Sequence, residues 1–178
     1  MKFVNFLNDL QRFDPKLVEN IKSIYLESVG ETANYEYGAG VLLICPSTKR
    51  LLLGLRSDNQ DDSNVWCGFG GKGEPGETPI QTAMREVWEE TKIHPRTYKI
   101  ITPALHINQN SDTFKFHNYL GIVDSEIIPK INDEHKLAKW LSLPELSKIP
   151  LHRGLTTILT DIEKASVINK YIDGNFNS

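Results

Sequence analysis

The sequence predicts a single α/β domain, and three features indicate this class. Short apolar runs rich in β-branched and aromatic residues alternate with segments whose apolar residues recur at helical spacing. The chain has 178 residues, and a chain of about 150 residues already hides roughly 70% of its extended surface when it folds. No repeat, low-complexity tract or linker divides the sequence, so we expect one globular unit with its own core.

The first expected elements are an N-terminal extension and a hairpin. Residues 1–37 mix short apolar groups with charges, which predicts an extension packed on a domain of residues 38–178. From Gly38, the runs GAGVLLICP and RLLLGLR are separated by the polar STK, as in a β-hairpin. After the polar loop SDNQDDSN, five glycines occur between Gly68 and Gly76. This density predicts an irregular segment whose backbone passes close to a ligand.

The best specified element is a helix that begins near Thr78. Thr78 is a suitable N-cap, Pro79 suits the first helical position, and Gln81 stands where a capping box has Glu or Gln. The apolar residues that follow recur at helical spacing and predict a stripe facing the core: Ile80, Ala83, Met84, Val87 and Trp88.

Further strands and helices are expected in the second half of the chain. The runs YKIITPALHI and FKFHNYLGIV predict two strands, and HKLAKWLSLPEL follows them. In the last stretch, LTTILTDIEKASVINKYI, one helical face is predicted from Leu155, Ile158, Leu159, Ile162 and Val167. Two or three helices therefore interleave with the strands.

The composition argues against several classes of protein. Cys45 and Cys67 are the only cysteines, which disfavours a disulfide framework or a cysteine-based zinc site and suits a reducing, cytoplasmic compartment. The first residues lack a signal-peptide pattern, and no apolar run approaches the roughly 20 residues needed to cross a bilayer. The net charge of -3 gives no overall attraction to nucleic acid or anionic membrane. We expect neither as a partner, and a homodimer remains open.

Three glutamates of the predicted helix share one sector of its surface. Glu86, Glu89 and Glu90 project away from the apolar stripe. Like charges at this spacing cost about 0.2 to 0.5 kcal/mol per pair, and acids in the last turn oppose the helix dipole. A divalent cation turns this penalty into binding energy, because Mg²⁺ prefers carboxylate oxygens. The alternative is an ordinary solvated face.

Three cationic residues accompany the glutamates. Arg85 lies beside them and eight residues after Glu77, and a guanidinium can bind a carboxylate through two parallel hydrogen bonds. A Glu77–Arg85 pair is therefore expected to orient the glycine-rich segment against the helix. Arg56 and Lys72 are exposed by pattern and are candidates for binding phosphate, although ordinary solvated charges explain them equally well.

Together these residues resemble the Nudix box. The family pattern is Gly, five residues, Glu, seven residues, Arg-Glu, an aliphatic residue, any residue, Glu-Glu, any residue, Gly and an aliphatic residue, and the chain follows it from Gly71 to Ile93. The one departure is Lys92, which replaces the final glycine. The flanking hairpin and WLSLPEL extend a looser resemblance over about residues 38–146.

The resemblance implies a fold, a reaction and a cofactor. The fold is an α/β/α sandwich around a mixed sheet, and the reaction is hydrolysis of a nucleoside diphosphate linked to another group, X. The resemblance also implies that Glu86, Glu89 and Glu90 bind Mg²⁺ or Mn²⁺, with the backbone carbonyl of Gly70 or Gly71 as a further ligand. Such a cation neutralises the diphosphate and lowers the pKa of the attacking water.

The general base varies across the family. This chain offers Glu86 itself or an acid of the loop NDEHK, either Asp133 or Glu134. Glu134-His135 ahead of Trp140 looks like a common arrangement of the family. A solvated loop acid explains Glu134 equally well.

The sequence leaves several substrates open. The string GFGGK resembles the branch that acts on oxidised purine nucleoside triphosphates. That branch implies an asparagine after Trp66 and an aspartate pair soon after Trp140, but those places hold Cys67 and Ser142-Leu143. We therefore expect a nucleotide pyrophosphohydrolase acting on a nucleoside triphosphate, on ADP-ribose or another nucleotide sugar, or on a dinucleoside polyphosphate.

Two other functions fit the same fold. A catalytically silent module could bind a nucleotide as a sensor or regulator, but a sensor need not keep all three carboxylates. Isomerisation of an isopentenyl-type diphosphate requires a catalytic cysteine in the pocket, and Cys67 has no clear partner in the sequence. Among the histidines, structural roles rather than ligation are expected for His106 and His117. Among the aromatic residues, places in the core rather than base-stacking roles are expected for Trp66, Trp140 and Tyr119.

Overall fold

The structure is a computed structural model of the chain, and it describes residues 36–109 and 114–174. For residues 102–104 and 106–109 it describes the backbone alone. The N-terminal extension expected over residues 1–37 therefore lies outside the described residues, apart from its last two positions, which open the first strand.

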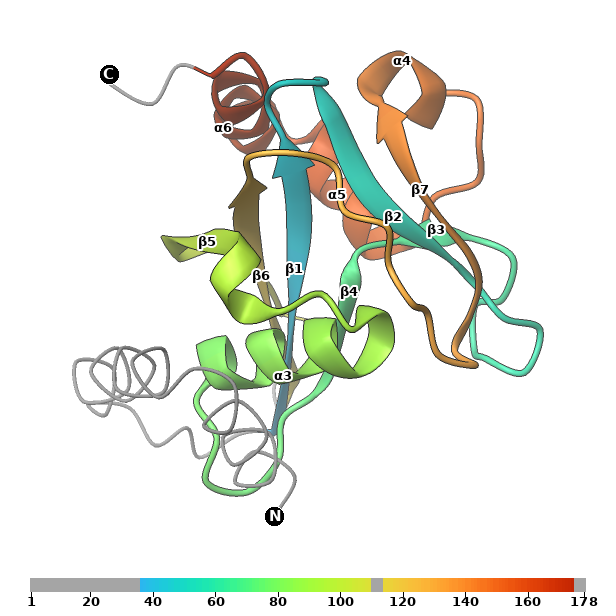
Figure 1. The fold of residues 1–178 in the computed structure, drawn as a ribbon. Coiled ribbons are helices and arrows are strands. Elements are labelled where there is room, and N and C mark those ends of the chain that lie inside the picture. Colours follow the sequence, from blue (N-terminus) through green and yellow to red (C-terminus); the bar gives the residue numbers. More distant parts are fainter. Residues whose placement is uncertain (1–35, 110–113, 175–178) are drawn as a thin grey trace.

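Seven strands of the described residues form one mixed sheet, as the α/β assignment predicts (Figure 1). The strand order is β3-β2-β1-β6-β5, with β4 paired to β1 and β7 paired to β2. The strands are β1 (Glu36–Cys45), β2 (Arg50–Arg56), β3 (Trp66–Cys67), β4 (Phe69–Lys72), β5 (Tyr98–Gln109), β6 (Phe114–Val123) and β7 (His135–Ser142). The expected hairpin is β1–β2, and the two later apolar runs form the antiparallel pair β5–β6.

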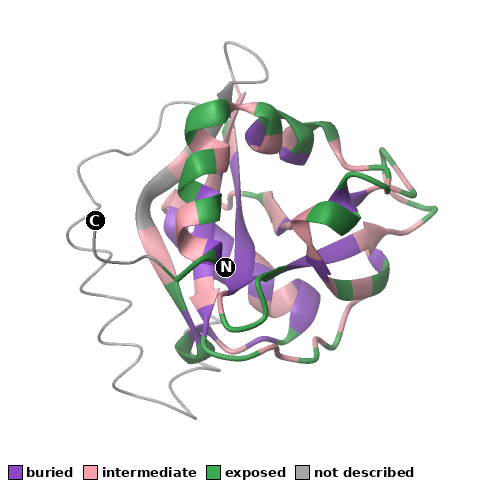
Figure 2. Cartoon of the chain, turned by 90° about the horizontal axis from the view of Figure 1, so that it is seen from above, coloured by how far each residue is buried: buried purple, intermediate pink, exposed green. Residues whose placement is uncertain are grey.

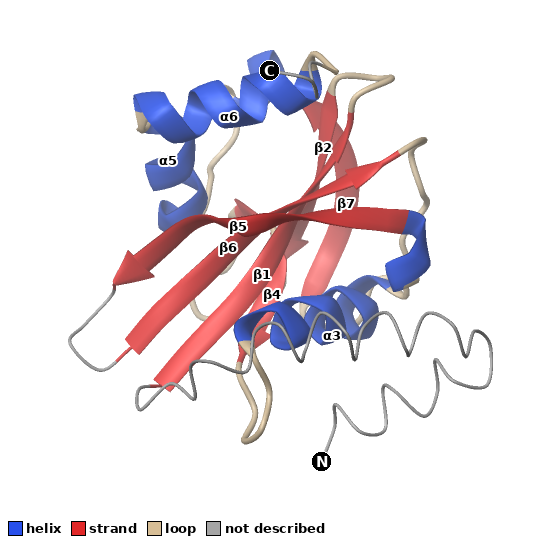
Figure 3. Ribbon diagram, turned by 90° about the vertical axis from the view of Figure 1, so that its left-hand side faces the viewer, coloured by secondary structure: helices blue, strands red, loops and turns tan. Residues whose placement is uncertain are grey.

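Strand β1 contributes to two hydrophobic cores, because alternate side chains of a strand point to opposite faces. Val41 and Leu43 pack in the core that includes α3 (Pro79–Thr91). Leu42 and Ile44 belong instead to the core beneath the C-terminal helices. Helices cover both faces of the sheet (Figure 3), so the α/β/α sandwich is confirmed. Figure 2 shows the central strands as the buried layer, with exposed residues on the outer sides of the helices.

The glycine-rich segment is more regular than its composition predicts. Gly70 and Gly71 lie within β4, which pairs antiparallel with β1, so the expectation of an irregular segment is wrong for these residues. A Cβ on Gly70 would come within 2.4 Å of the Gly40 Cα, and a Cβ on Gly71 within 2.7 Å of the Glu86 carboxylate. These glycines therefore serve close packing of strand on strand and strand on helix, and the irregular positions of the segment are Gly68 and the residues from Gly73 onward.

Helix α3 begins as predicted. Thr78 precedes it in an extended conformation, Pro79 is its first residue, and Gln81 Oε1 accepts a hydrogen bond from the backbone N–H of Thr78 at 2.8 Å. Glu90 is only 2% exposed, which argues against an ordinary solvated face. Of the predicted stripe, four residues are buried and the last is half-buried: Ile80, Ala83, Met84, Val87 and Trp88.

The end of α3 shows what the departure from the family pattern does. Lys92 follows the helix in the left-handed region, with φ 56° and ψ 17°. Its backbone N–H donates to the Trp88 carbonyl at 2.9 Å, and its Nζ lies 5.6 Å from the centroid of the Trp88 ring. Glycine adopts a positive φ without steric cost, whereas other residues lose about 1–2 kcal/mol there. Lys92 therefore adopts a left-handed turn that glycine would form without this cost in stability.

We expect Lys92→Gly to raise the free energy of unfolding by about 1 kcal/mol, because relief of the strained φ exceeds the loss of an exposed cation–π contact of about 0.5 kcal/mol. Urea denaturation followed by circular dichroism measures the change. Lys92→Ala is the control, since it removes the ammonium but keeps a Cβ, and it should not be stabilised. A Lys92→Gly variant less stable than wild type would contradict this account of the turn.

The C-terminal segment forms two helices, α5 (Arg153–Thr160) and α6 (Ile162–Ile172), instead of one continuous helical face. Asp161 separates them, and its side chain accepts a hydrogen bond from the Lys164 backbone N–H as an N-cap. The predicted face is therefore interrupted at Asp161, where the chain ends one helix and starts the next. Leu155 and Ile158 are buried and Leu159 is half-buried, but Ile162 is 87% exposed and Val167 is 39% exposed.

Two short helices complete the described fold. They are η1 (Pro95–Thr97) before β5 and α4 (Leu143–Leu146), which begins at the LPEL sequence directly after β7. Within the ranges that the structure describes, no helix combines the length and the apolar character needed to span a bilayer.

Candidate active site

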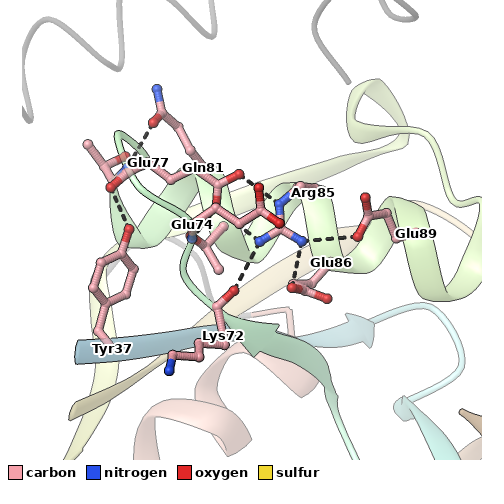
Figure 4. A network of polar contacts seen from close by, with 10 residues as sticks. Tyr37, Lys72, Glu74, Glu77, Gln81, Arg85, Glu86 and Glu89 are labelled. Atoms are coloured by element: carbon pink, nitrogen blue, oxygen red, sulfur yellow. Dashed lines mark hydrogen bonds and ion pairs between the residues drawn. The ribbon is translucent and has the colours of Figure 1, made fainter. Parts of the chain in front are cut away.

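Arg85 is the centre of a polar network on α3 (Figure 4). Its side chain is 1% exposed. Nε and Nη2 donate to the two oxygens of Glu77 at 2.7 and 2.9 Å, which is the bidentate pair that the sequence predicts. Nη1 donates to Glu86 Oε1 at 2.6 Å and to Glu89 Oε2 at 3.0 Å, and Nη2 also reaches the Lys72 carbonyl at 3.1 Å. One guanidinium thus joins the end of β4 to three carboxylates.

Glu77 is held as firmly as its partner. Its Oε2 also accepts from Thr82 Oγ1 at 2.7 Å and from the Glu74 backbone N–H at 3.1 Å. The hydroxyl of Tyr37 donates to the Glu77 carbonyl oxygen (Figure 4). These contacts engage both carboxylate oxygens, so the geometry suits a role in orienting Arg85 and the loop before α3.

Glu90 faces away from Arg85 and has different partners. Its Oε2 accepts from the backbone N–H of Gly70 at 3.2 Å and lies 3.1 Å from His135 Nε2. Gly70 therefore contacts the cluster through its N–H group, whereas the family resemblance implies a role for its carbonyl. The contact connects β4, α3 and the first residue of β7 in one place.

Glu134 comes close to the cluster from the loop before β7. Asn132 holds it in place: Asn132 Nδ2 donates to Glu134 Oε1 at 3.2 Å, and the Glu134 N–H donates to Asn132 Oδ1 at 3.1 Å. The backbone N–H of Asn132 in turn donates to the Glu90 carbonyl at 3.1 Å. The loop is thus attached to the end of α3, whereas Asp133, the other candidate acid of this loop, is exposed.

Negative charge exceeds positive charge in this cluster. Burial raises the pKa of Glu86 from its ordinary 4.5 to about 7, against the opposing effect of Arg85. Burial, followed by the charge of Glu134, raises the pKa of Glu90 well above its ordinary value. Burial disfavours the charged form of Arg85, but its hydrogen bonds and ion pairs outweigh burial and raise its pKa. A single guanidinium therefore faces more carboxylates than it can neutralise.

The donor set suits a hard divalent cation. Glu86, Glu89 and Glu90 each use one oxygen for the contacts described above, and the second oxygen accepts no hydrogen bond from any residue in the described ranges. Carboxylate oxygens with uncompensated charge are the ligands that Mg²⁺ and Mn²⁺ prefer. No three acidic, histidine or cysteine side chains of the described residues are already gathered into a complete metal site. The fit therefore rests on the chemistry of these oxygens.

The raised pKa of Glu86 has a testable effect on the metal-free protein. A folded-state pKa of about 7 against an ordinary 4.5 means that folding favours the protonated carboxyl. The protonated Glu86 carboxyl therefore contributes stability that is fully present below pH 4.5 and is lost as the pH rises through about 7. We expect Glu86→Gln to gain stability relative to wild type between roughly pH 5 and 8 in the presence of chelator.

Chemical denaturation of both proteins at the two pH values measures this gain. Glu163→Gln is the control, because Glu163 is exposed on α6, and its difference from wild type should not change with pH. The cause assigned to the Glu86 pKa is wrong if Glu86→Gln loses stability relative to wild type over the same range.

A cavity of about 440 Å³ adjoins the carboxylate cluster. Phe116, Leu155 and Ile158 give it an apolar wall between the sheet and α5, and Asn118 adds a polar group. Gly70 belongs to the same wall and also binds Glu90, so the cavity and the cluster meet at β4. Ligand pockets of about 300–1,000 Å³ hold small organic molecules, and this one is large enough for part of a nucleotide.

The two positively charged side chains expected to bind phosphate lie in different places. Arg56 lines the cavity together with His152 and Arg153, and its Nε donates to the Asp61 carbonyl at 2.9 Å. Lys72 is not among the residues that line the cavity, and its Nζ pairs with Glu36 at 3.1 Å. Arg56 therefore remains a candidate for binding phosphate. Lys72 instead contacts the Arg85 network, through its backbone carbonyl.

Cys67 is a buried thiol in the cavity wall. Burial, assisted by the charge of Glu90, raises the pKa of Cys67 to about 12, and its Sγ lies 3.7 Å from the Gly54 carbonyl. The thiolate is the nucleophilic form of cysteine, so a thiol with this pKa is poorly suited to catalysis near neutral pH. This argues against the isomerase alternative.

The aromatic residues and histidines behave largely as core residues. Trp66, Tyr119 and His117 are buried, and Trp140 packs against the core on the α3 side of the sheet. The side chain of His106 lies outside the described residues. The structure supports structural roles for Trp66, Trp140 and His117, whereas Tyr119 also lines the cavity.

Several site residues escape the sequence analysis. Thr82 lies near the start of α3, five positions after Glu77, and this local spacing could have revealed it. Tyr37 and His135 reach the site from distant strands. The sequence analysis names His135 only as the neighbour of Glu134, and no local pattern indicates the contact that either residue makes with a glutamate. The cavity residues Phe116 and Arg153 likewise come from β6 and α5, and only the fold brings them together.

Comparisons with known proteins identify relatives of this chain. A Pseudomonas fluorescens protein named NAD-capped RNA hydrolase NudC is 32% identical over 101 residues, which are 56% of this chain and 35% of that protein. A protein of the same name from Pseudomonas syringae pv. tomato is 27% identical over 100 residues, 56% of this chain and 34% of that protein. The chain thus matches about a third of the length of these curated relatives.

Solved structures share the fold at low sequence identity. The Nudix hydrolase RenU from M. smegmatis has a TM-score of 0.65 at 18% identity, covering 75% of this chain and 86% of that one. The C. elegans Ap4A hydrolase has a TM-score of 0.61 at 20% identity, covering 73% of this chain and 98% of that one. The family model described as the NUDIX domain matches residues 34–161, which is most of the chain, so the protein belongs to the Nudix hydrolase superfamily.

Proposed function

We propose that this protein hydrolyses the diphosphate link of a nucleoside diphosphate joined to another group, X, with Mg²⁺ or Mn²⁺ held by Glu86, Glu89 and Glu90. The cation would neutralise the diphosphate and favour the deprotonated form of the attacking water. The observation that carries the proposal is the set of partly and fully buried carboxylates around a single guanidinium, which leaves negative charge uncompensated beside a cavity.

The protein residues divide into orienting and reacting groups. Glu77 and Arg85 orient the cluster, since each is saturated with hydrogen bonds inside the protein. Glu86 or Glu134 serves as the general base that takes a proton from the attacking water. Glu134 is the better placed of the two loop acids, because Asn132 holds it beside α3.

The cavity is the proposed site for the nucleoside or for X. Its apolar wall suits a base or ring, and Arg56 at the same wall suits a phosphate. The places that read an oxidised base in the related branch hold Cys67 and Ser142-Leu143. We therefore do not assign a base preference.

The test is a substrate panel assayed for release of phosphate or nucleoside monophosphate, with Mg²⁺ and then with chelator. The panel contains ADP-ribose, a dinucleoside polyphosphate, NAD, NAD-capped RNA, and dGTP with its oxidised form. We expect cation-dependent hydrolysis of at least one, and less than about tenfold preference for the oxidised triphosphate, roughly 1.4 kcal/mol in transition-state terms. Turnover that survives exhaustive chelation would overturn the role of the cation.

NAD and NAD-capped RNA are on the panel because the curated relatives are named for the second of them. The expectation that nucleic acid is not a partner remains a prediction, and the RNA substrate tests it. A catalytically silent nucleotide sensor is the alternative function. It would bind members of the same panel without hydrolysing them under any cation.

A further inference from the structure

We propose that His135 is a positioning residue for Glu90. Its Nε2–H holds Oε2 of the carboxylate, so that Oε1 remains available to the cation. This inference rests on the proposed function in taking Glu90 as a ligand of that cation. His135 would not touch the cation or the substrate, and would act only through Glu90.

The two donors to Glu90 converge on the same oxygen. The Gly70 backbone N–H lies 3.2 Å from Oε2, and His135 Nε2 lies 3.1 Å from it. The Gly70 donor belongs to β4 and the His135 donor to β7, so two strands determine the orientation of one side chain from α3. The glutamate and histidine side chains are each 3% exposed, and water therefore cannot replace either donor freely.

The ring of His135 is held in place by its neighbours. Phe69 meets it edge-on, with ring centroids 5.1 Å apart and planes at 74°. On β2, a Cβ at position Gly54 would lie 2.5 Å from His135 Nδ1. Glycine at this position is therefore what allows the ring to lie flat against β2 and reach Glu90.

The proposed role sets the tautomer of His135. A Glu90 that binds a cation is ionised and only accepts hydrogen bonds, so in that state the ring carries its proton on Nε2. Nδ1 is then an acceptor, and it has no hydrogen-bond partner in the part of the chain that the structure describes. A buried polar atom without a partner costs about 1–3 kcal/mol. The arrangement keeps the donor at Glu90 in spite of that cost.

The same loop also fixes the main chain of Glu90. The Asn132 backbone N–H donates to the Glu90 carbonyl at 3.1 Å, and the His135 N–H donates to the Asn132 carbonyl at 3.4 Å. Asn132 holds Glu134 as well, at 3.2 Å. Residues 132–135 therefore place a helix glutamate and a loop glutamate relative to one another, with His135 as the contact to the Glu90 side chain.

The test compares His135→Leu, which removes the donor, with His135→Gln, whose amide N–H₂ can take the place of Nε2–H. Mn²⁺ binding by the full chain is measured by electron paramagnetic resonance without substrate, and kcat and KM are measured separately at saturating Mg²⁺. We expect His135→Leu to weaken Mn²⁺ binding about 10- to 100-fold, as loss of a residue that orients a metal ligand does. His135→Gln should recover most of this affinity, and KM should change less than kcat.

Gly54→Ala tests the same contact without deleting the histidine, because the added methyl displaces the ring. It should weaken Mn²⁺ binding in the same direction as His135→Leu, and it carries the test if His135→Leu does not fold. His94→Leu is the matched control, since the Nδ1 of His94 caps η1 and its ring packs against Trp88 rather than against a glutamate of the cluster. It should leave Mn²⁺ affinity unchanged even if stability falls.

Each result separates the inference from the proposed function. If wild type binds Mn²⁺ and hydrolyses the substrate while folded His135→Leu or Gly54→Ala binds Mn²⁺ equally well, His135 is only a packing residue and the inference alone is wrong. Equal loss in folded His135→Gln and His135→Leu contradicts it too. If wild type neither binds Mn²⁺ nor hydrolyses any substrate, the proposed function fails and the inference fails with it.

Discussion

Glu90→Gln is expected to lower kcat/KM by on the order of 100-fold or more at saturating Mg²⁺. The substitution keeps the size and shape of the side chain, so an amide oxygen can still accept from the Gly70 N–H, which lies 3.2 Å from the carboxylate. What it removes is the negative charge. Because that charge would hold the cation, and the cation in turn the anionic diphosphate, the loss falls on the transition state rather than on the fold.

Steady-state kinetics on the best substrate of the panel measure this loss. Glu163→Gln, an exposed glutamate of α6, is the matched control and should retain wild-type kinetics. Circular dichroism establishes that both variants are folded. A folded Glu90→Gln with unchanged kcat/KM would remove Glu90 from the active site.

Arg85→Ala is expected to cost about 3–5 kcal/mol of unfolding free energy, because removing one partner of a buried ion pair leaves charges without compensation. The arginine is 1% exposed and the Glu77 side chain 2% exposed, and the lost guanidinium also serves two further carboxylates and a carbonyl. The pair is therefore an element of stability as well as of orientation. Arg85→Lys should recover little, since an ammonium cannot match the planar fork.

Urea denaturation of Arg85→Ala, Arg85→Lys and wild type measures the cost. Arg96→Ala, at an exposed position of η1, is the control and should remain within about 0.5 kcal/mol of wild type. A loss below about 1 kcal/mol in Arg85→Ala would mean that water or a rearranged loop compensates the carboxylates.

The parts of the site that the sequence could predict are those whose information is local. Glu77, Arg85 and the three glutamates lie on or next to one helix, and the 3.6-residue period determines which of them share a face. The start of α3 is equally local, since Thr78 and Gln81 interact over one turn. These predictions needed no knowledge of the sheet.

The parts that the sequence could not predict depend on contacts between distant segments. Gly70 and Gly71 suggested a loop, because their composition does not reveal that β1 and α3 pack directly against them. His135 reaches Glu90 across 45 positions of the chain. The burial of Glu90 follows from the same long-range packing, and a helical wheel places it on the polar side.

The most direct test of the account is whether the carboxylates of α3 lower the stability of the cation-free protein and raise it when a cation is bound. In chelator, Glu90→Gln should be as stable as wild type or slightly more stable, because it removes a carboxyl group whose charged form is disfavoured by burial, as its raised pKa indicates. In Mg²⁺, wild type should become the more stable of the two proteins. At a concentration of about 100 times its dissociation constant, the cation stabilises wild type by about 2.7 kcal/mol. It should stabilise Glu90→Gln by less. Thermal unfolding of both proteins under both conditions, with and without nucleotide, measures this. If wild type shows no response to Mg²⁺ even with nucleotide, and Glu90→Gln keeps full activity, the cluster is not a cation site and the proposed function is wrong.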